Sequence, residues 1–283
     1  MKIKKLIIIE AVVMTLMLSL PILGQSFQDR LNVVAFGGYY AKQQNTNANG
    51  HNEGVYVDGL PFKSSNGVWT AGLYGSASIS SFRDNISRYD GNIKEYGGGI
   101  TVGYYKADLS AKYQLFVGAS AGVKYSDDQG SSSSRWGEYV GRQKDWLMAT
   151  TINLNLLSNA AILPRTQVVV SFQKPFKSEK TASWNDATIP SDVWDKTYVE
   201  IIGRQSIINA KIGELFLSPK LTALYSFSKG NKESKYAVGG ELALHRPYKD
   251  DFLSLYCYYK MSNITDNQEF SFGLNLNIAT FIH

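Results

Sequence analysis

The stretch EFSFGLNLNI, residues 269–278, decides the fold of this chain. Its even-numbered positions hold Phe, Phe, Leu, Leu and Ile, and its odd-numbered positions hold Glu, Ser, Gly, Asn and Asn. Successive side chains of a β-strand point to opposite faces, so the pattern predicts a strand with one apolar and one polar face. Such a strand suits a barrel wall whose apolar face meets lipid.

The first residues have the layout of an export signal. Three lysines precede an apolar stretch at 6–23, and small residues suited to cleavage follow it. A retained membrane anchor is the alternative, because about 20 apolar residues cross a bilayer, but Glu10 interrupts the stretch. We expect residues 1–24 to be a cleaved signal peptide, cut after Gly24 or Ser26, and residues 25–283 to form the barrel.

The same alternation recurs through the rest of the chain. Further alternating segments lie at 69–79, 96–104, 113–125, 146–156, 166–172, 197–207, 215–227, 236–244 and 252–261. Two weaker strand candidates precede them, 30–42, which has apolar residues on both faces, and 54–62. Strands of soluble proteins have about five or six residues, whereas tilted membrane strands need about 9–11. The pattern predicts an all-β fold, a single antiparallel transmembrane β-barrel of about twelve strands. About ten strands remain the alternative, because Gly59 and Pro61 weaken the segment 54–62.

Connections between these segments alternate in length. Short ones fall near 107–110, 158–163, 210–213 and 246–250, and long ones at 83–94, 126–138 and 174–195. Outer-membrane barrels have short periplasmic turns and longer external loops. We therefore expect both termini in the periplasm and the long loops outside. Tyr96, Tyr104, Tyr113 and Tyr125 at the segment ends fit aromatic girdles.

Residues 271–278 resemble the C-terminal assembly signal of bacterial outer-membrane β-barrels, with Ser271, Gly273, Leu276 and Ile278 in the motif positions. The resemblance implies the outer membrane of a Gram-negative bacterium, contact with membrane lipid and lipopolysaccharide, and recognition by the barrel-assembly machinery. The export segment and the Tyr-rich strands are similar to those of small Bacteroidota barrels. The chain departs from the motif at its end, where Ile282 and His283 follow an aromatic residue.

Several functional classes are disfavoured. Cys257 is the single cysteine, so an internal disulfide or cysteine metal cluster cannot form, and we expect no metal or other cofactor. A net charge of +5 is too mild to suggest nucleic acid. A barrel hydrolase would need a His base beside a nucleophile or carboxylate. His51, His245 and His283 fall in a predicted external loop, at the periplasmic rim and at the terminus, so we expect no enzyme, with a His51-dependent hydrolase as the alternative.

The inward face is the candidate functional surface. The candidate lumen-lining residues are Lys112, Lys124, Glu200, Arg204, Lys220, Glu241, Lys260 and Glu269. Their excess of cations predicts a weakly positive lining. The expected function is a small channel or binding barrel for small polar or anionic solutes. The alternatives are a closed barrel that serves a surface assembly and a soluble β-sandwich. Trp136, Trp184 and Trp194 lie in the predicted external loops, where they would stack on sugars or anchor the loops.

Overall fold

The computed structural model describes residues 34–44, 48–63, 69–84, 88–107, 113–135, 137–158, 162, 164–189, 195–230, 232–245, 251–262 and 269–277. These residues belong to one compact unit, Asn32–His283. The predicted signal peptide lies outside the described residues, as do Lys112, Trp136, Trp194, Ile278 and His283. Within the described part of the chain, no helix is long and apolar enough to cross a membrane.

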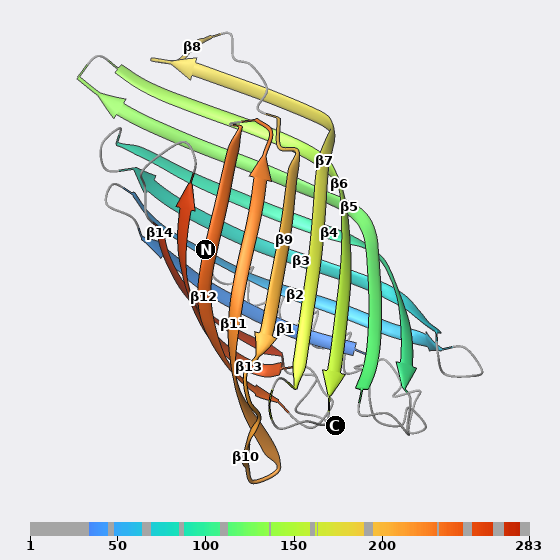
Figure 1. Ribbon diagram of the computed structural model, residues 1–283. Coiled ribbons are helices and arrows are strands. Elements are labelled where there is room, and N and C mark those ends of the chain that lie inside the picture. The colour runs from blue at the N-terminus through green and yellow to red at the C-terminus, as the bar shows by residue number, and fades with distance from the viewer. Residues whose placement is uncertain are drawn as a thin grey trace. The chain divides into compact units, whose positions relative to one another are not determined.

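The described residues form one 14-stranded antiparallel sheet (Figure 1). Its long strands are β1 (Val34–Gln44), β2 (Ala48–Lys63), β3 (Trp69–Asp84), β4 (Tyr89–Ala107), β5 (Tyr113–Ser134), β6 (Gly137–Ser158), β7 (Arg165–Trp184), β9 (Tyr198–Ser206), β11 (Leu215–Ser228), β12 (Glu233–His245), β13 (Asp251–Ser262) and β14 (Glu269–Asn277). Two short strands, β8 (Ala187–Thr188) and β10 (Ala210–Ile212), extend hairpins at the sheet ends.

The long strands pair in a closed ring. Strand β1 pairs with both β2 and β14, and β9 joins β7 to β11. The twelve long strands therefore leave no free edge among the strands that the structure describes. The all-β barrel fold is confirmed, and β1 and β2 belong to its wall, contrary to the ten-strand alternative. A register shift between Gly59 and Phe62 accommodates Pro61, which lacks an N–H for the ladder.

Burial in the barrel is the reverse of that in a soluble protein. Inward side chains are polar and buried, such as Lys220 and Ser254, each 4% exposed. Outward side chains are apolar and exposed, such as Ile100 and Leu221, each 60% exposed. The period-two segments produce this arrangement because each strand sends alternate side chains to opposite faces. The outer surface is thus an apolar band.

Aromatic side chains border this band. Tyr96, Tyr125 and Trp146 face each other in one row across β4, β5 and β6. At the other end of the band, Trp69 packs on Tyr104 with ring centroids 4.8 Å apart. The interval from Trp146 to Leu156 rises about 33 Å along the strand, or about 25 Å along the barrel axis at a tilt of about 40°. That height suits the hydrocarbon band of an outer-membrane barrel.

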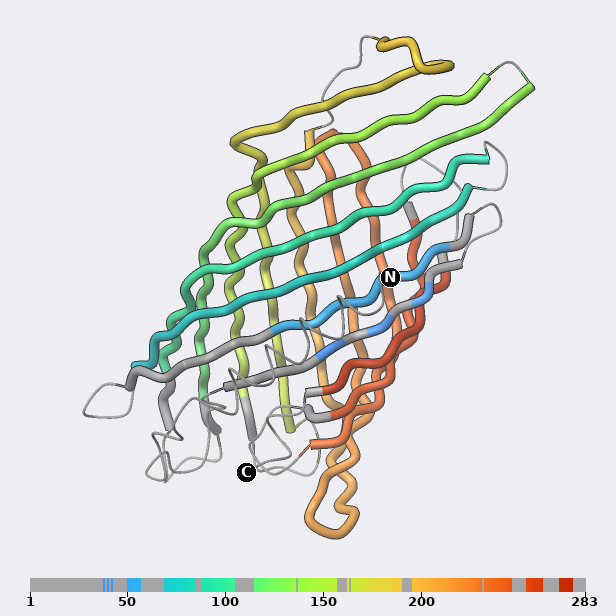
Figure 2. Tube along the Cα trace, turned by 180° about the vertical axis from the view of Figure 1, so that it is seen from behind, coloured from blue at the N-terminus to red at the C-terminus, as the bar shows by residue number. Residues whose placement is uncertain are grey.

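One side of the barrel continues far beyond the aromatic row. The β5–β6 ladder runs on from Tyr125 and Trp146 to Ser134 and Gly137. On the opposite side, the β11–β12 ladder ends at Ser228, soon after the aromatic Tyr225. Figures 1 and 2 show β5, β6 and β7 reaching past the ends of β9 and β11. We call the parts of β3 to β7 beyond this row the projecting wall.

The projecting wall corrects the predicted loops. The stretches 83–94, 126–138 and 174–195 were expected as long loops, but most of each belongs to a hairpin strand. The stretch 131–134, within the expected loop at 126–138, ends β5. The physical reason is that a wall with water on both faces needs no apolar face, so its sequence does not alternate in polarity.

Strand β1 begins and β14 ends at the same rim, where Gly37 pairs with Asn277.

Candidate functional site

Two clusters of charged and polar side chains lie on the inner face. The mouth cluster lies where the barrel meets the projecting wall and contains Glu95, Lys124, Ser126, Asp128, Gln143, Asp145 and Lys196. The waist cluster lies on β7, β9, β11 and β12 and contains Gln167, Arg204, Lys220 and Glu241. Together they are the candidate functional site.

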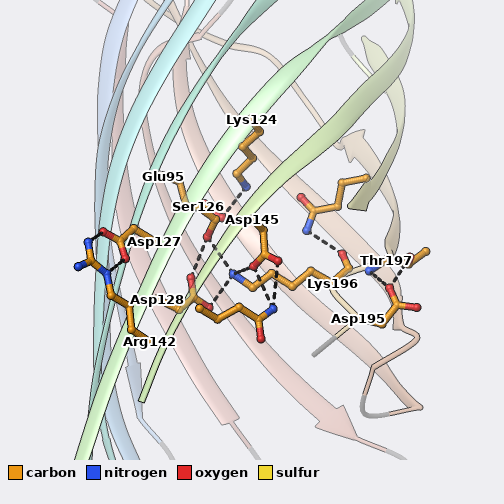
Figure 3. A network of polar contacts seen from close by, with 12 residues as sticks. Glu95, Lys124, Ser126, Asp127, Asp128, Arg142, Asp145, Asp195, Lys196 and Thr197 are labelled. Carbon is orange, nitrogen blue, oxygen red and sulfur yellow. Dashed lines mark hydrogen bonds and ion pairs between the residues drawn. The ribbon is translucent and has the colours of Figure 1, made fainter. Parts of the chain in front are cut away.

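Lys196 is the centre of the mouth cluster (Figure 3). It belongs to the connection between β7 and β9, and its Nζ lies 2.7 Å from Asp128 Oδ2 and 2.8 Å from Asp145 Oδ2. The same ammonium donates a hydrogen bond to Ser126 Oγ at 3.0 Å. Asp145 is fully buried, and Gln143 Nε2 donates to both its oxygens at 3.1 Å. The buried carboxylate is thus paired and hydrogen-bonded, which a charge in such a place requires.

The backbone around Lys196 is anchored on both sides. Asp195 accepts hydrogen bonds from the Thr197 amide at 2.9 Å and the Thr197 hydroxyl at 2.6 Å. It also pairs with Lys229, just beyond β11, at 3.0 Å. These hydrogen bonds and the Lys229 charge lower the pKa of Asp195 from 3.8 to about 2. Gln173 on β7 donates to the Lys196 carbonyl at 3.4 Å. The connection is therefore a brace that ties β7 and β11 to the inner face of β5 and β6.

The waist cluster is built around Glu241. Its Oε1 lies 3.5 Å from Lys220 Nζ and its Oε2 lies 3.4 Å from Arg204 Nε. Arg204 Nη1 also donates to Gln167 Oε1 at 3.1 Å. The strand register explains these contacts, because Lys220 faces Glu241 directly and Arg204 faces Gln167.

Hydrogen bonding in the waist is incomplete. Arg204 Nε and Glu241 Oε2 are buried and close, yet they lack hydrogen-bond geometry with each other or with another described group. Asn52 Oδ1, on the inner face of β2, is also buried without a protein partner. A buried polar group without a hydrogen bond costs about 1–3 kcal/mol. These atoms therefore favour contact with water or a polar solute.

The predicted lumen residues divide between these clusters and other inward positions. Lys124 pairs with Glu95 at 2.8 Å in the mouth cluster, and Arg204, Lys220 and Glu241 form the waist cluster. Glu200 accepts a 2.6 Å hydrogen bond from Tyr198. Lys260 lies opposite Glu269 in the β13–β14 register, although the Glu269 side chain is outside the described part of the structure.

The acidic half of the mouth cluster was missed from sequence. Ser126 and Asp128 continue the even-numbered inward face of Lys124, so a longer period-two segment would have included them. Asp145 likewise follows the odd-numbered inward face of β6. No local pattern indicates that Lys196 reaches them, because that contact depends on a connection folding back onto distant strands.

The segment predicted as the assembly signal forms the closing strand. Ser271 and Gly273 are buried, while Phe270 and Phe272 are exposed on the outer face. Leu276 pairs with Gly38 of β1 and with Leu253 of β13. The segment therefore joins the two ends of the sheet.

The histidines occupy separate places. His51 lies on β2, so its predicted position in a loop is wrong. Ser81 Oγ lies 2.8 Å from Nδ1 and 3.2 Å from Nε2 of His51. It therefore meets the ring edge between both nitrogens, unlike a nucleophile aligned with one lone pair. His245 is buried beside Asn209, with 3.3 Å between Nε2 and Oδ1. The described residues contain no group of three side chains arranged to hold a metal ion.

Comparisons with known proteins agree on the architecture. No protein-family model matches the sequence. No curated protein matches it significantly. The translocator domain of the autotransporter NalP from Neisseria meningitidis is similar in structure, with a TM-score of 0.58 at 8% identity, over 86% of this chain and 87% of that domain. The β domain of the Bordetella autotransporter BrkA has a TM-score of 0.51 at 13% identity, over 86% and 98% of the two chains.

At these identities the likeness concerns the fold, and it adds no support for the resemblance to Bacteroidota barrels. It agrees with the closed ladder, the polar interior and the apolar band between aromatic rows. By these features, the chain is a transmembrane β-barrel of the bacterial outer-membrane type.

Proposed function

We propose that the protein is a passive channel for small polar solutes across the outer membrane. The observation that carries the proposal is incomplete hydrogen bonding on the inner face, where Arg204 Nε and Glu241 Oε2 of the waist cluster and Asn52 Oδ1 of β2 lack protein partners. Buried water makes about three hydrogen bonds to such groups. A hydrated interior within an apolar outer band provides a route for polar molecules.

The charges of the mouth refine the expected solute. Glu95 offsets the predicted Lys124, and Asp128 and Asp145 offset Lys196. A lining with paired charges exerts little net attraction on either sign of ion. Within this proposal, neutral polar solutes are therefore favoured over anions.

The remaining expectations belong to the same proposal. Residues 1–24 act as the export signal, both termini lie in the periplasm, and the projecting wall extends outside the cell. The assembly machinery recognises the last strand, and the outer band contacts lipid and lipopolysaccharide. We expect no enzymatic activity.

A closed barrel that supports a surface assembly is the second candidate. The brace favours it, because Lys196 holds the β7–β9 connection against the inner face of the mouth. Conductance separates an open barrel from a closed one.

The test is single-channel conductance of the refolded protein in planar bilayers. Lys196→Met should raise the conductance, because losing one partner of a buried ion pair costs about 3–5 kcal/mol and would release the brace. Lys177→Met is the matched control, since Lys177 lies on an exposed face and pairs with the exposed Glu179. Folded protein that does not conduct, with or without Lys196, would overturn the channel and favour the closed barrel.

A further inference from the structure

The inner face of the projecting wall carries a row of aromatic rings beyond the mouth cluster. Phe82 on β3 pairs with Gly91 on β4. Gly91 begins a row of small residues that continues with Gly130, Gly141 and Ala182 on β5, β6 and β7. The next row towards the tip contains Tyr89, Ser132, Tyr139 and Trp184. We call Phe82, Tyr89, Tyr139 and Trp184 the aromatic floor.

Three of the rings lie over glycines. A Cβ atom added at Gly91 would overlap the Phe82 ring, and one at Gly130 would overlap the Tyr89 ring. One at Gly141 would overlap the hydroxyl oxygen of Tyr139 and lie 3.0 Å from its ring. Because glycine has no Cβ, each ring can rest against the strand backbone. The glycine row therefore leaves the space in which the rings pack against the sheet.

The glycines are covered by the para ends of the rings, Cζ of Phe82 and the hydroxyl ends of Tyr89 and Tyr139. Phe82 and Tyr89 stack with ring centroids 5.7 Å apart and planes inclined at 30°. Phe82 is still 40% exposed and Trp184 is 38% exposed. On the far side of the barrel, the described β11–β12 ladder ends before this level (Figure 1). Packing within the sheet does not explain why these rings keep so much exposed surface.

We propose that the aromatic floor binds a neutral saccharide chain. A sugar ring has an apolar C–H face that packs on aromatic rings, and hydroxyl groups at its edge that need hydrogen-bonding neighbours. The structure supplies both kinds of surface. Ser132 lies between the rings, and the row on the barrel side of the glycines contains Asp128, Gln143 and Lys180.

The charges of this region point to a neutral ligand. Asp128 and Asp145 are held by Lys196, and Glu95 is held by Lys124. An acidic polysaccharide would require a surplus of lysine or arginine, which these pairs do not provide. Polar side chains also interrupt the rings, so the surface suits a polyhydroxylated chain better than a continuous apolar peptide.

The inference concerns a surface outside the barrel lumen and does not require conduction. The refolded full-length protein is titrated with maltohexaose, cellohexaose and chitohexaose, by calorimetry and by tryptophan fluorescence. We expect saturable binding of at least one of these chains. Tyr139→Leu should weaken it about tenfold, because leucine still covers Gly141 but has no planar face. Trp184→Ala should weaken calorimetric binding to a similar extent.

Two variants serve as controls. Tyr139→Phe keeps the ring and should bind as the unchanged protein does. Val140→Ala alters the exposed outer face of the same strand and should also leave binding unchanged. Absence of binding by folded protein, or equal affinity in Tyr139→Leu, would overturn the proposal. So would stronger binding of a sulfated oligosaccharide or an apolar peptide. If the protein conducts but binds no sugar, only the saccharide inference is overturned. If it binds sugar but does not conduct, only the channel proposal is overturned.

Discussion

At the residue scale, the barrel depends on where a Cβ atom can fit. Gly273 lies on the inner face of the closing strand, beneath the ring of Tyr256. A Cβ at this position would overlap the backbone carbonyl oxygen of Tyr40 on β1 as well as that ring. At Gly203 on β9, an added Cβ would have no heavy atom within 4 Å. The two glycines therefore provide a matched comparison.

Gly273→Ala should destabilise the barrel by about 1–3 kcal/mol, because the strand backbones at the β14–β1 seam must move apart. Gly203→Ala should be neutral or slightly stabilising, since alanine reduces the freedom of the unfolded chain. Urea unfolding in lipid vesicles, followed by gel mobility, measures both. Equal midpoints would contradict this account. If Gly273→Ala refolds normally in vitro but fails to reach the membrane in cells, the residue acts in recognition by the assembly machinery instead.

At the element scale, the connection between β7 and β9 determines what the mouth looks like. Lys196 joins this connection to β5 and β6, and Asp195 joins it to Thr197 and to Lys229. Short segments tied down by side-chain hydrogen bonds lose order when those bonds are lost. The protonation state of Asp195 should therefore control the order of the brace.

The sign follows from the pKa of Asp195, which falls from 3.8 to about 2 in the folded protein. Its contribution to order is fully present above pH 3.8 and is lost as the pH falls towards 2. Hydrogen exchange of the Thr197 amide, corrected for its intrinsic pH dependence, should accelerate over this range. Asp195→Asn should show faster exchange at neutral pH and no step in acid. If the exchange rate of Asp195→Asn rises in acid as much as that of the unchanged protein, a group other than Asp195 causes the pH dependence.

At the scale of the whole molecule, the two faces of the sheet meet different solvents. Ile152 lies on the outer face of β6 between the aromatic rows and is exposed. Its neighbour Asn153 faces inward, where its Oδ1 accepts hydrogen bonds from Asn155 and Gln167. A charge costs a great deal in hydrocarbon and much less in a polar interior.

Ile152→Lys should destabilise the barrel in vesicles by about 2–4 kcal/mol, as expected for a lysine near the bilayer midplane. Asn153→Asp should cost much less, because the new charge enters a polar face and its carboxylate still accepts hydrogen bonds from Asn155 and Gln167. Urea titration of both variants in vesicles measures the difference. Equal destabilisation would mean that the outer face of the barrel does not meet lipid.

The strands could be predicted from sequence where they cross the membrane, but not where they continue into the projecting wall. Segments such as 252–261 and 269–278 were found almost at the bounds of β13 and β14, because lipid on one face and a polar interior on the other enforce alternation. The second strand was also found, despite Pro61, because a bulge accommodates that residue. The outer half of β5, which reads SDDQGSSSS, was mistaken for a loop because both of its faces tolerate polar side chains.

By itself, the sequence determined the all-β barrel fold, the apolar and polar faces of the clearly alternating strands and the place of the last strand in the wall. These properties are local, since a strand reveals its two environments through its own alternation. The tertiary structure alone decided that Lys196 reaches Asp128 and Asp145, that Glu241 lies between Arg204 and Lys220, and that the rings of β3, β4 and β6 rest over glycines. Those contacts join residues far apart in the chain, so they depend on strand register and on the closure of the ring.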